Sequence, residues 1–360
     1  MLAKILVLPG DGIGVEVTDV SIDILRSISE KHGLELKLDF KLFGGSSIDK
    51  HGVPITDEVI KKAAESDAVL MGAVGGPKWE NLDHKLKPES GLLALRKELD
   101  AFANLRPAIV YSALSDASTL KREIIENVDI MVVRELTSGI YFGQPRGIEK
   151  TPGGEERGFN TLSYTKSEIE RIARVAFNIA RKRKRHVVSI DKANVLEVMQ
   201  FWRDTVSNIR EDEYPDIELV HLYVDNAAMQ LIRRPKSFDV ILAGNMFGDI
   251  ISDEAAQLTG SLGMLPSASL GTKGAIYEPV HGSAPDIAGN DIANPIASIL
   301  TTAMMLKYSL NLDYIAEDMD KAVRITLDNG YRTADIYEDG TKKVGCVEMG
   351  ELIKKELESM

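Results

Sequence analysis

Three aspartates at the predicted ends of strands have types and spacing that suggest metal chemistry. Asp249 and Asp253 are four residues apart in a predicted helix, so they share one helix face, where like charges repel unless a cation lies between them. Asp225 opens another predicted helix, directly after an apolar strand at residues 219–224. One aspartate at a helix start is usually only a cap. Three of them, without a nearby His or Cys cluster, fit a hard divalent cation such as Mg²⁺ or Mn²⁺.

Arginines in apolar surroundings form a second group. Four residues at i, i+3, i+4 and i+7 lie in one stripe on a face of a predicted helix: Glu89, Leu92, Leu93 and Arg96. The first and last of them are charged, and the two between them are leucines. Arg106 follows an apolar segment, and Arg134 ends the predicted strand at residues 130–133. A lone arginine usually makes a surface ion pair. Because a guanidinium binds a carboxylate through two parallel hydrogen bonds, the set favours a site for a substrate with several carboxylates.

Two further residues and one glycine-rich segment carry weaker signals. Lys192 follows the apolar strand at residues 187–190, and Tyr141 lies in a loop between two glycines. A lysine acts as a base only when its surroundings depress its pKa, which a sequence does not reveal. The segment Gly10-Asp11-Gly12-Ile13-Gly14 follows a strand and opens a helix, but its glycine spacing does not match the dinucleotide fingerprint. It predicts a tight turn exposing backbone amides, and it disfavours an ordinary Rossmann fold.

These residues depend on an alternation of short apolar runs with helical patterns. Strands are predicted at residues 5–8, 34–42, 68–74, 130–133, 187–190, 219–224 and 240–243, and helices at 15–29, 167–183 and 195–208. Such alternation is typical of an α/β protein with largely parallel sheets. The glycine-rich stretch at residues 143–164 predicts either a long surface loop or an arm that contacts a second subunit. The basic run at residues 181–185 is interpreted as an ordinary helix C-terminus.

Composition restricts the class of protein. The 360 residues carry a formal charge of −12, which argues against a general nucleic-acid surface. The single Cys346 excludes an intrachain disulfide and suits a reducing compartment. The longest apolar stretch, at residues 296–306, is too short to span a membrane, and the N-terminus lacks the pattern of a signal peptide. We therefore expect a two-domain protein of the cytoplasm.

Several longer motifs together resemble one known family. GDGIG, ANLRP, VVREL, SGIYFG, DKANVL, YVDNAAM, GNMFGDIISDE and EPVHGSAPDIAG occur in this order between residue 4 and about residue 335. They are similar to the isopropylmalate/isocitrate dehydrogenase family of β-hydroxyacid oxidative decarboxylases. The resemblance implies a two-domain α/β fold with mixed sheets that differs from the ordinary Rossmann fold. One domain would be discontinuous, from residues 1–101 plus 260–360, and residues 102–259 would form the second, dimerising domain.

The resemblance also implies a role for each candidate residue. Asp225, Asp249 and Asp253 would bind Mg²⁺ or Mn²⁺, and Tyr141, Lys192 and Asp225 would transfer protons, with Lys192 and Asp225 reaching the partner's site in a homodimer. The substrate would contact Glu89, Leu92, Leu93, Arg96, Arg106, Arg134, Tyr141, Lys192, Asn194, Val195 and Asp225. NAD would contact Ile13, Gly75, Gly76, Glu278, His281, Gly282, Ser283, Ala284, Pro285, Asp286, Asn294 and Asp335.

Two positions indicate the substrate and the cofactor. Isocitrate-specific members of the family place a serine and an asparagine on the helix before the first arginine, whereas this chain presents Glu89, Leu92 and Leu93 there. An extra carboxylate beside the two leucines would be buried without a partner. The leucines instead suit the isopropyl group of (2R,3S)-3-isopropylmalate, whose oxidative decarboxylation belongs to leucine biosynthesis. Asp286 would bond the ribose hydroxyls of NAD and repel the phosphate of NADP.

Other functions remain open. D-malate and tartrate dehydrogenases share much of the motif pattern. The aspartates alone would also suit a metal-dependent phosphoryl-transfer enzyme, and the arginines alone a non-catalytic dicarboxylate-binding protein. A phosphoryl-transfer enzyme gives no role to Asp286 or to the leucine pair, and a dicarboxylate-binding protein needs neither a metal nor Lys192.

Overall fold

The computed structural model describes residues 2–360, which divide into two compact units. The first unit contains residues up to Ala101, Val110–Arg122 and the chain from Thr259 onward, and the second contains Phe102–Ile109 and Glu123–Leu258. The first unit is thus discontinuous. Residues 110–122 belong to it, although the expected boundary placed them in the second. Contacts with distant parts of the chain account for the difference: the Tyr111 hydroxyl donates to Asp320 at 2.9 Å, and Arg332 donates to the carbonyl of Ala113 at 2.6 Å.

The first unit is built on a mixed sheet with strand order β2-β1-β3-β12-β11. The strands are β1 (Leu2–Gly10), β2 (Glu35–Phe40), β3 (Ala68–Ala73), β11 (Ala268–Gly271) and β12 (Ala275–Tyr277). All neighbouring pairs are parallel except β11 with β12. The helices are α1 (Gly14–His32), α2 (Gly45–His51), α3 (Asp57–Ala64), α4 (Pro88–Glu98), α10 (Ile296–Tyr308), α11 (Asp313–Asp328) and α12 (Cys346–Ser359). Two short strands, β13 (Tyr331–Arg332) and β14 (Lys342–Lys343), pair separately.

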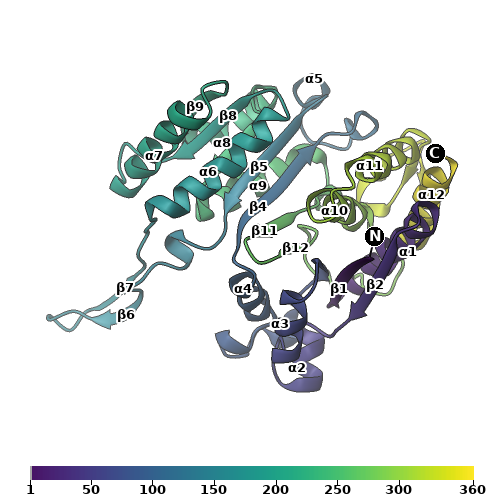
Figure 1. The fold of residues 1–360 in the computed structure, drawn as a ribbon, viewed down its shortest axis with the longest axis horizontal. Helices are drawn as coiled ribbons and strands as arrows, with labels where there is room; N and C mark the ends of the chain where they lie inside the picture. Colours follow the sequence, from purple (N-terminus) through teal and green to yellow (C-terminus); the bar gives the residue numbers. More distant parts are fainter. Residues whose placement is uncertain (1) are drawn as a thin grey trace. The chain divides into compact units, whose positions relative to one another are not determined.

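Both faces of this sheet are covered by helices. Leu6 and Leu8 of β1 pack in one core cluster with residues of α3 and α4, whereas α1 and α10 contact β3 and also pack on α11 and α12 (Figure 1). Helix α10 contains the long apolar stretch and is buried along most of its length. The stretch is therefore a core helix, and no helix within residues 2–360 is long and apolar enough to cross a membrane.

The second unit has a sheet with strand order β4-β5-β10-β8-β9. Its strands are β4 (Ala101–Ile109), β5 (Asp129–Glu135), β8 (His186–Asp191), β9 (Glu218–Tyr223) and β10 (Val240–Ala243), and only β4 runs antiparallel to its neighbour. Its helices are α5 (Arg122–Ile125), α6 (Lys166–Arg181), α7 (Glu197–Glu213), α8 (Val224–Arg233) and α9 (Asn245–Ala256). Because four strands are parallel, their carboxyl ends, where the candidate residues lie, meet at one edge.

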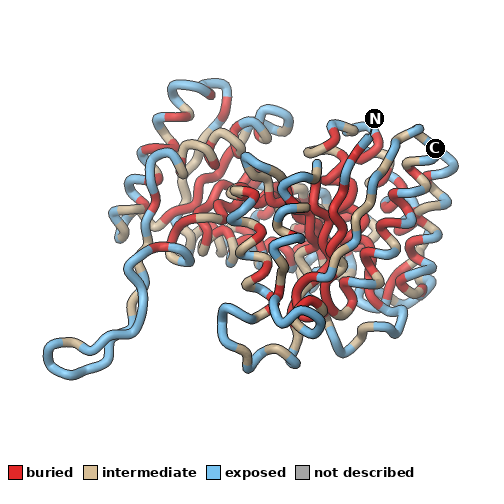
Figure 2. The backbone as a smooth tube through the Cα atoms, turned by 60° about the horizontal axis from the view of Figure 1, so that its bottom comes forward, coloured by how far each residue is buried: buried red, intermediate tan, exposed pale blue. Residues whose placement is uncertain are grey.

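A hairpin extends from the second unit in the glycine-rich stretch. Strands β6 (Gly147–Lys150) and β7 (Glu156–Phe159) pair only with each other, and the hairpin is exposed along almost its whole length (Figures 1 and 2). Ile148 at its start is 80% exposed. The stretch thus forms an arm rather than an unstructured loop, and what the arm contacts stays a prediction.

The predicted strands and helices are confirmed, with ends that differ by a few residues. Helix α6 begins at a capping box in which Thr165 and Glu168 satisfy each other's backbone amides. The basic run after it makes local ion pairs, Arg181 with Asp216 and Arg183 with Asp129 and Asp239. These pairs agree with the interpretation of the run as a helix end. The α/β class with mixed sheets is likewise confirmed.

Candidate active site

Two arginines, a tyrosine and two aspartates converge in the second unit. Arg106 Nη1 donates to Asp253 at 3.0 Å and to Ser252 at 2.8 Å, and Arg106 Nη2 lies 3.8 Å from Asp249. Arg134 forms an ion pair with the same Asp249, and the Tyr141 hydroxyl donates to the other oxygen of Asp249 at 3.1 Å. Asp249 is therefore the centre of a cluster that brings together five of the residues predicted from sequence.

The fold explains why Arg134 approaches α9 so closely. Arg134 ends β5 and is only 5% exposed, and a Cβ at Gly248 would lie 2.7 Å from its side chain. Asn245, the first residue of α9, accepts from Arg134 Nη2 at 2.8 Å and donates from its amide nitrogen to the carbonyl of Ser138 at 3.1 Å. The hydroxyl of Tyr164 accepts the backbone amide of Asn245 at 2.8 Å. The arginine, the loop of Tyr141 and the start of α9 are thus held together.

Tyr141 is in the protonated form that a proton donor requires. Burial raises the pKa of Tyr141 above its ordinary value, and the neighbouring carboxylate of Asp249 raises it further, since a second negative charge there is unfavourable. The loop before it is fixed by Glu135, which is fully buried and accepts the amides of Thr137 and Ser138 at 2.8 and 2.9 Å.

Lys192 and Asp225 form a separate pair in the second unit. Lys192 Nζ donates to Asp225 at 2.7 Å, and this bond lowers the pKa of Asp225. Across residues 2–360, no three His, Cys, Asp or Glu side chains are grouped closely enough to hold a metal ion. Asp225 therefore does not join Asp249 and Asp253 within one chain. Asn194 and Val195 follow Lys192 in an exposed turn, and Val195 is 67% exposed.

A network that the sequence did not predict supports the turn of Lys192. Asp191 is fully buried at the end of β8, and Arg203 of α7 donates to both of its oxygens at 2.8 Å. Asp191 also accepts the amide of Ala193 at 3.0 Å. The only signal in the sequence is a carboxylate closing an apolar run, which is shared by many strand ends.

In the first unit, α4 carries the predicted stripe. Leu92 packs against the core and Leu93 is 47% exposed, while Arg96 forms an ion pair with Glu278 at 2.5 Å. The Nε atom of Arg96 is buried without a hydrogen-bond partner among the described residues. Leu93 and Glu89 line a pocket of about 370 Å³ together with Trp79 and Gly76. The stripe therefore combines an apolar wall with a guanidinium that has donor capacity left.

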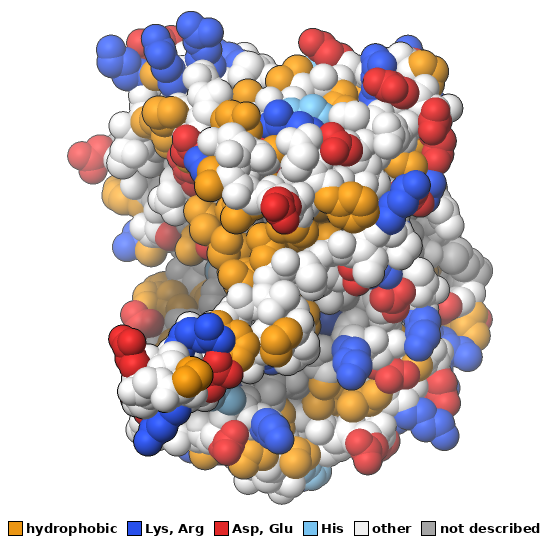
Figure 3. Space-filling model, turned by 90° about the vertical axis from the view of Figure 1, so that its left-hand side faces the viewer, with side chains coloured by type: hydrophobic (Ala, Val, Ile, Leu, Met, Phe, Trp, Pro, Cys, Tyr) orange, Lys and Arg blue, Asp and Glu red, His pale blue; other side chains and the backbone are white. Residues whose placement is uncertain are grey.

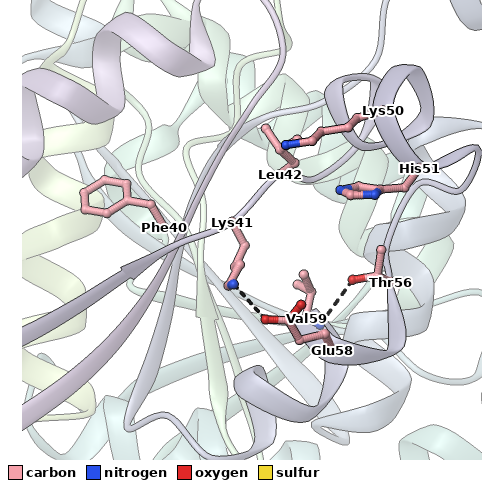
Figure 4. A pocket seen from close by; sticks show the side chains of 8 residues that line it. All are labelled: Phe40, Lys41, Leu42, Lys50, His51, Thr56, Glu58 and Val59. Carbon is pink, nitrogen blue, oxygen red and sulfur yellow. Dashed lines mark hydrogen bonds and ion pairs between the residues drawn. The ribbon is translucent and has the colours of Figure 1, made fainter.

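A second pocket, of about 440 Å³, contains none of the predicted site residues. Eight residues around the C-terminal end of α2 line it: Phe40, Lys41, Leu42, Lys50, His51, Thr56, Glu58 and Val59 (Figure 4). Lys41 is paired with Glu58 at 2.7 Å, and Thr56 caps α3 through the amide of Val59. One lysine and the glutamate of this pocket thus neutralise each other, and its threonine hydroxyl caps a helix.

The residues expected to bind a cofactor also lie in the first unit. Asn294 donates to Asp335 at 3.0 Å, and Ser261 donates to the same carboxylate at 2.5 Å. Burial lowers the pKa of His281, so its ring is neutral at pH 7, and its buried Nε2 has no hydrogen-bond partner within residues 2–360. Asp286 is exposed on the adjoining loop. A neutral ring with a free nitrogen and an exposed carboxylate fit the adenine and ribose of a dinucleotide.

The remaining cofactor candidates differ in how they are placed. Gly75 has a φ of 101°, and a Cβ there would lie 2.7 Å from Glu89, so its bare backbone can approach a ligand. Ile13 instead packs in an apolar cluster with Val17 and Cys346, where its side chain is 5% exposed. On the loop at residues 281–289, Gly282 and Pro285 are exposed, Ser283 is buried and Ala284 is half-buried.

The fold and the clusters define an α/β protein in which arginines, aspartates and a tyrosine gather in one unit, and the candidate dinucleotide contacts lie in the other. The chain belongs to the isocitrate/isopropylmalate dehydrogenase family, whose model matches residues 4–353. It is 54% identical to a 3-isopropylmalate dehydrogenase of Pseudomonas putida over 100% of both chains, and 57% identical to one of Thermosynechococcus vestitus over 98% of both. A crystal structure of an isocitrate dehydrogenase from Methylococcus capsulatus is 32% identical, with a TM-score of 0.86 and 99% of each chain covered.

Proposed function

We propose that this chain oxidises and decarboxylates (2R,3S)-3-isopropylmalate, with NAD as hydride acceptor and a divalent metal, in the leucine biosynthesis of the cytoplasm. The products are 4-methyl-2-oxopentanoate and CO₂. The observation that carries the proposal is the convergence of Arg106, Arg134 and Tyr141 on the aspartates of α9. The apolar pair Leu92 and Leu93 supports an isopropyl substituent, as does the 54–57% identity to 3-isopropylmalate dehydrogenases against 32% to the isocitrate dehydrogenase.

The arginines bind and orient the substrate. In this structure Arg106 pairs with Asp253 and Arg134 pairs with Asp249. A diacid that binds the two arginines competes with these aspartates for guanidinium donors that are already desolvated and held in place. Holding both carboxylates fixes the hydroxyl-bearing carbon relative to the proton-transfer residues, which removes much of the entropic cost of reaction.

A metal ion would be held by Asp249 and Asp253 of one subunit and by Asp225 of a second. Their oxygens are the ligands that Mg²⁺ and Mn²⁺ prefer. The metal supplies Lewis-acid stabilisation of negative charge on the substrate oxygen. The adjacent arginines limit the repulsion between the two aspartates of α9 before it binds.

Protons move through Lys192 and Tyr141. The neutral amine of Lys192, formed when its own proton passes to the neighbouring Asp225, accepts the proton of the substrate hydroxyl as hydride leaves the carbon that bears this hydroxyl. Loss of CO₂ from the resulting 2-isopropyl-3-oxosuccinate leaves an enolate, and Tyr141, which stays protonated because burial and Asp249 raise its pKa, protonates its carbon. Asp286 selects NAD by bonding the ribose hydroxyls and repelling a 2′-phosphate.

A homodimer completes this site. Among residues 2–360, Asp225 does not group with Asp249 and Asp253 in one chain, and a second copy would bring Asp225 and its paired Lys192 to them. Met229 and Ile232 of α8 and Ile250 of α9 are 61%, 40% and 56% exposed, an apolar surface that a partner would cover. Figure 3 shows apolar side chains gathered beside the arm on the side of the molecule that it draws.

Nicotinamide absorbance tests the reaction. We expect NADH formation from 3-isopropylmalate to depend on added Mn²⁺ and to exceed, in kcat/KM, that from D-malate, tartrate or isocitrate. A higher kcat/KM for D-malate or tartrate would assign the chain to those activities. No NADH from any diacid would refute the proposal and leave phosphoryl transfer or simple diacid binding.

Mixing two inactive variants tests the shared site. Arg134→Ala and Lys192→Ala each remove one half of it, so each homodimer should be inactive. A random mixture of unfolded and refolded variants should recover about a quarter of the wild-type activity, since half of the dimers have one intact site. No recovery would place both residues in the site of the same chain.

A further inference from the structure

A buried carboxylate in the glycine-rich turn of β1 joins three segments of the first unit. Asp11 is 5% exposed, and its oxygens accept the backbone amides of Gly45 and Ser46 at the start of α2, both at 2.8 Å. The oxygen that accepts Gly45 also accepts the amide of Gly75 at 3.0 Å. The turn was expected to expose its own backbone amides. Instead, its aspartate collects amides from other segments.

Gly75 is held through both of its backbone polar groups. Its amide donates to Asp11, and its carbonyl accepts the hydroxyl of Ser283 at 2.8 Å. The backbone of the same turn reinforces this arrangement, because the amide of Asp11 donates to Ala73 at 2.7 Å and that of Ile13 donates to the carbonyl of Ser283 at 2.8 Å. Gly75 therefore has little freedom to shift its backbone.

We propose that Asp11 is a positioning residue for the nicotinamide half of the cofactor, acting through the backbone of Gly75 and Gly76. The proposal rests on the NAD-linked function proposed above and on the expectation, from the family resemblance, that Gly75 and Gly76 flank the nicotinamide half of NAD. A carboxylate suits the task because it accepts all three amides and donates none. Ser283, on the candidate cofactor loop, bonds to the carbonyl of the residue whose amide Asp11 accepts, so Asp11 and Ser283 both act on the backbone of Gly75.

The physical alternative is a role in folding alone. If Asp11 only stabilised the fold, its substitution would lower the free energy of unfolding and leave the affinity for the cofactor unchanged. A positioning role instead changes the affinity for NADH and the KM for NAD, while the KM for the diacid, which is set by Arg106 and Arg134, stays near its original value. The two readouts separate the explanations.

Four variants test the proposal: Asp11→Asn, Asp11→Ser, Ser283→Ala and the combination of Asp11→Ser with Ser283→Ala. In Asp11→Asn, the side-chain oxygen can still accept the amides of Gly45 and Gly75, and the side-chain nitrogen then faces only the amide of Ser46. Because the bond to Gly75 is kept, this variant should bind NADH nearly as well as the wild type. Asp11→Ser is too short to reach all three amides and should weaken NADH binding about tenfold, the loss expected for a hydrogen bond to a charged group. Asp67→Asn is the matched control, because Asp67 accepts the amide of Lys4 at 2.7 Å at the other end of β1.

Fluorescence titration with NADH, steady-state KM values for NAD and 3-isopropylmalate, and thermal unfolding are measured on each variant. We expect Asp11→Ser and Ser283→Ala each to raise the NADH Kd, and the combination to raise it by less than the product, because both act on Gly75. Unchanged NADH affinity in Asp11→Ser with lowered stability overturns the proposal, as does an equal effect of Asp67→Asn. A wild-type protein that binds NADH without turning over 3-isopropylmalate refutes the proposed substrate but leaves this test intact, and one that does not bind NADH overturns both.

Discussion

Replacing Arg203 by methionine probes the buried charge beside the proposed proton-transfer lysine. Asp191 is fully buried and receives two hydrogen bonds of 2.8 Å from Arg203. Methionine keeps much of the apolar stem of the arginine but removes its charge. Breaking a buried ion pair costs about 3–5 kcal/mol, and we expect about 3 kcal/mol here because the Arg203 side chain is 24% exposed. The unfolding midpoint of the second unit should fall by roughly 6–12 °C.

The same variant should change the pH dependence of stability through His221. Its Nδ1 lies 3.7 Å from Asp191, and its Nε2 lies 2.9 Å from the hydroxyl of Ser207. Burial lowers the pKa of His221 below 6.5, and the charge of Arg203 lowers it further, against a smaller opposing effect of Asp191. The unfolded chain therefore binds more protons than the native protein, and wild-type stability falls as the pH falls below about 6.5.

Without Arg203, Asp191 favours the protonated ring of His221, so the pKa of His221 rises. The loss of stability on acidification should then be smaller than in the wild type or should reverse. The largest possible difference in slope is about 1.4 kcal/mol per pH unit for one proton. Urea unfolding at about pH 7.5 and about pH 5.5, followed by fluorescence of the buried Trp202, measures both effects.

The control is His221→Gln, alone and combined with Arg203→Met. Removing the titrating ring should abolish the difference in pH slope and leave most of the loss in stability at pH 7.5. Equal free energies of unfolding for Arg203→Met and the wild type would refute the account of Asp191. Identical pH slopes would refute the account of His221.

Three substitutions test the remaining assignments. Lys192→Ala removes the amine that pairs with Asp225 and should lower kcat on the order of 10³-fold, while NADH affinity in a fluorescence titration stays the same. Tyr141→Phe removes the hydroxyl bonded to Asp249, so protonation after CO₂ loss should slow about 100-fold, measured as product formed per NADH in single-turnover mixing. Asp286→Lys should lower the ratio of kcat/KM for NAD to that for NADP by at least about tenfold, because lysine attracts the 2′-phosphate that aspartate repels.

Each of these outcomes has a clear contrary result. Loss of NADH binding in Lys192→Ala would mean that the lysine maintains the cofactor site rather than moves a proton. A Tyr141→Phe variant with wild-type product formation would assign the proton to another donor. An unchanged cofactor preference in Asp286→Lys would mean that Asp286 does not contact the ribose.

The sequence predicted the elements and the strand-end residues well because these depend on local patterns. Apolar runs of four to six residues mark β5, β8 and β10, and side chains that follow parallel strands meet at one edge. Asp249 and Asp253 share a helix face by spacing alone, and the cluster around Asp249 agrees with that expectation.

What the sequence did not predict depends on contacts between distant segments. Asp11 and Gly75 are 64 positions apart, and Arg96 and Glu278 are 182 apart, so no local pattern links them. No pattern in the sequence singles out Asn245, yet its side chain bonds both to Arg134 and to the carbonyl of Ser138 in the loop before Tyr141. The segment at residues 110–122 belongs to the first unit because of contacts with the side chains of Asp320 and Arg332. No periodic pattern in the sequence predicts these contacts.

The discontinuous first unit has a consequence for biosynthesis. Helix α1 packs on α12, and three of its side chains bond to that helix: Asp23 to Lys354 at 2.9 Å, Ser27 to Glu358 at 2.9 Å and Lys31 to the carbonyl of Leu357 at 2.7 Å. A ribosome makes α1 near the beginning and α12 near the end. The second unit, largely continuous in sequence, is complete before α12 leaves the exit tunnel.

The apolar face of α1, including Val17 opposite Cys346, therefore stays without its last partner for most of translation. At about 5–20 residues per second, the interval between α1 and α12 lasts tens of seconds. During that time this face of the nascent chain is open to chaperones and to nascent chains on neighbouring ribosomes. The rate of synthesis, rather than the final stability, thus sets how long this protein is exposed to misassembly.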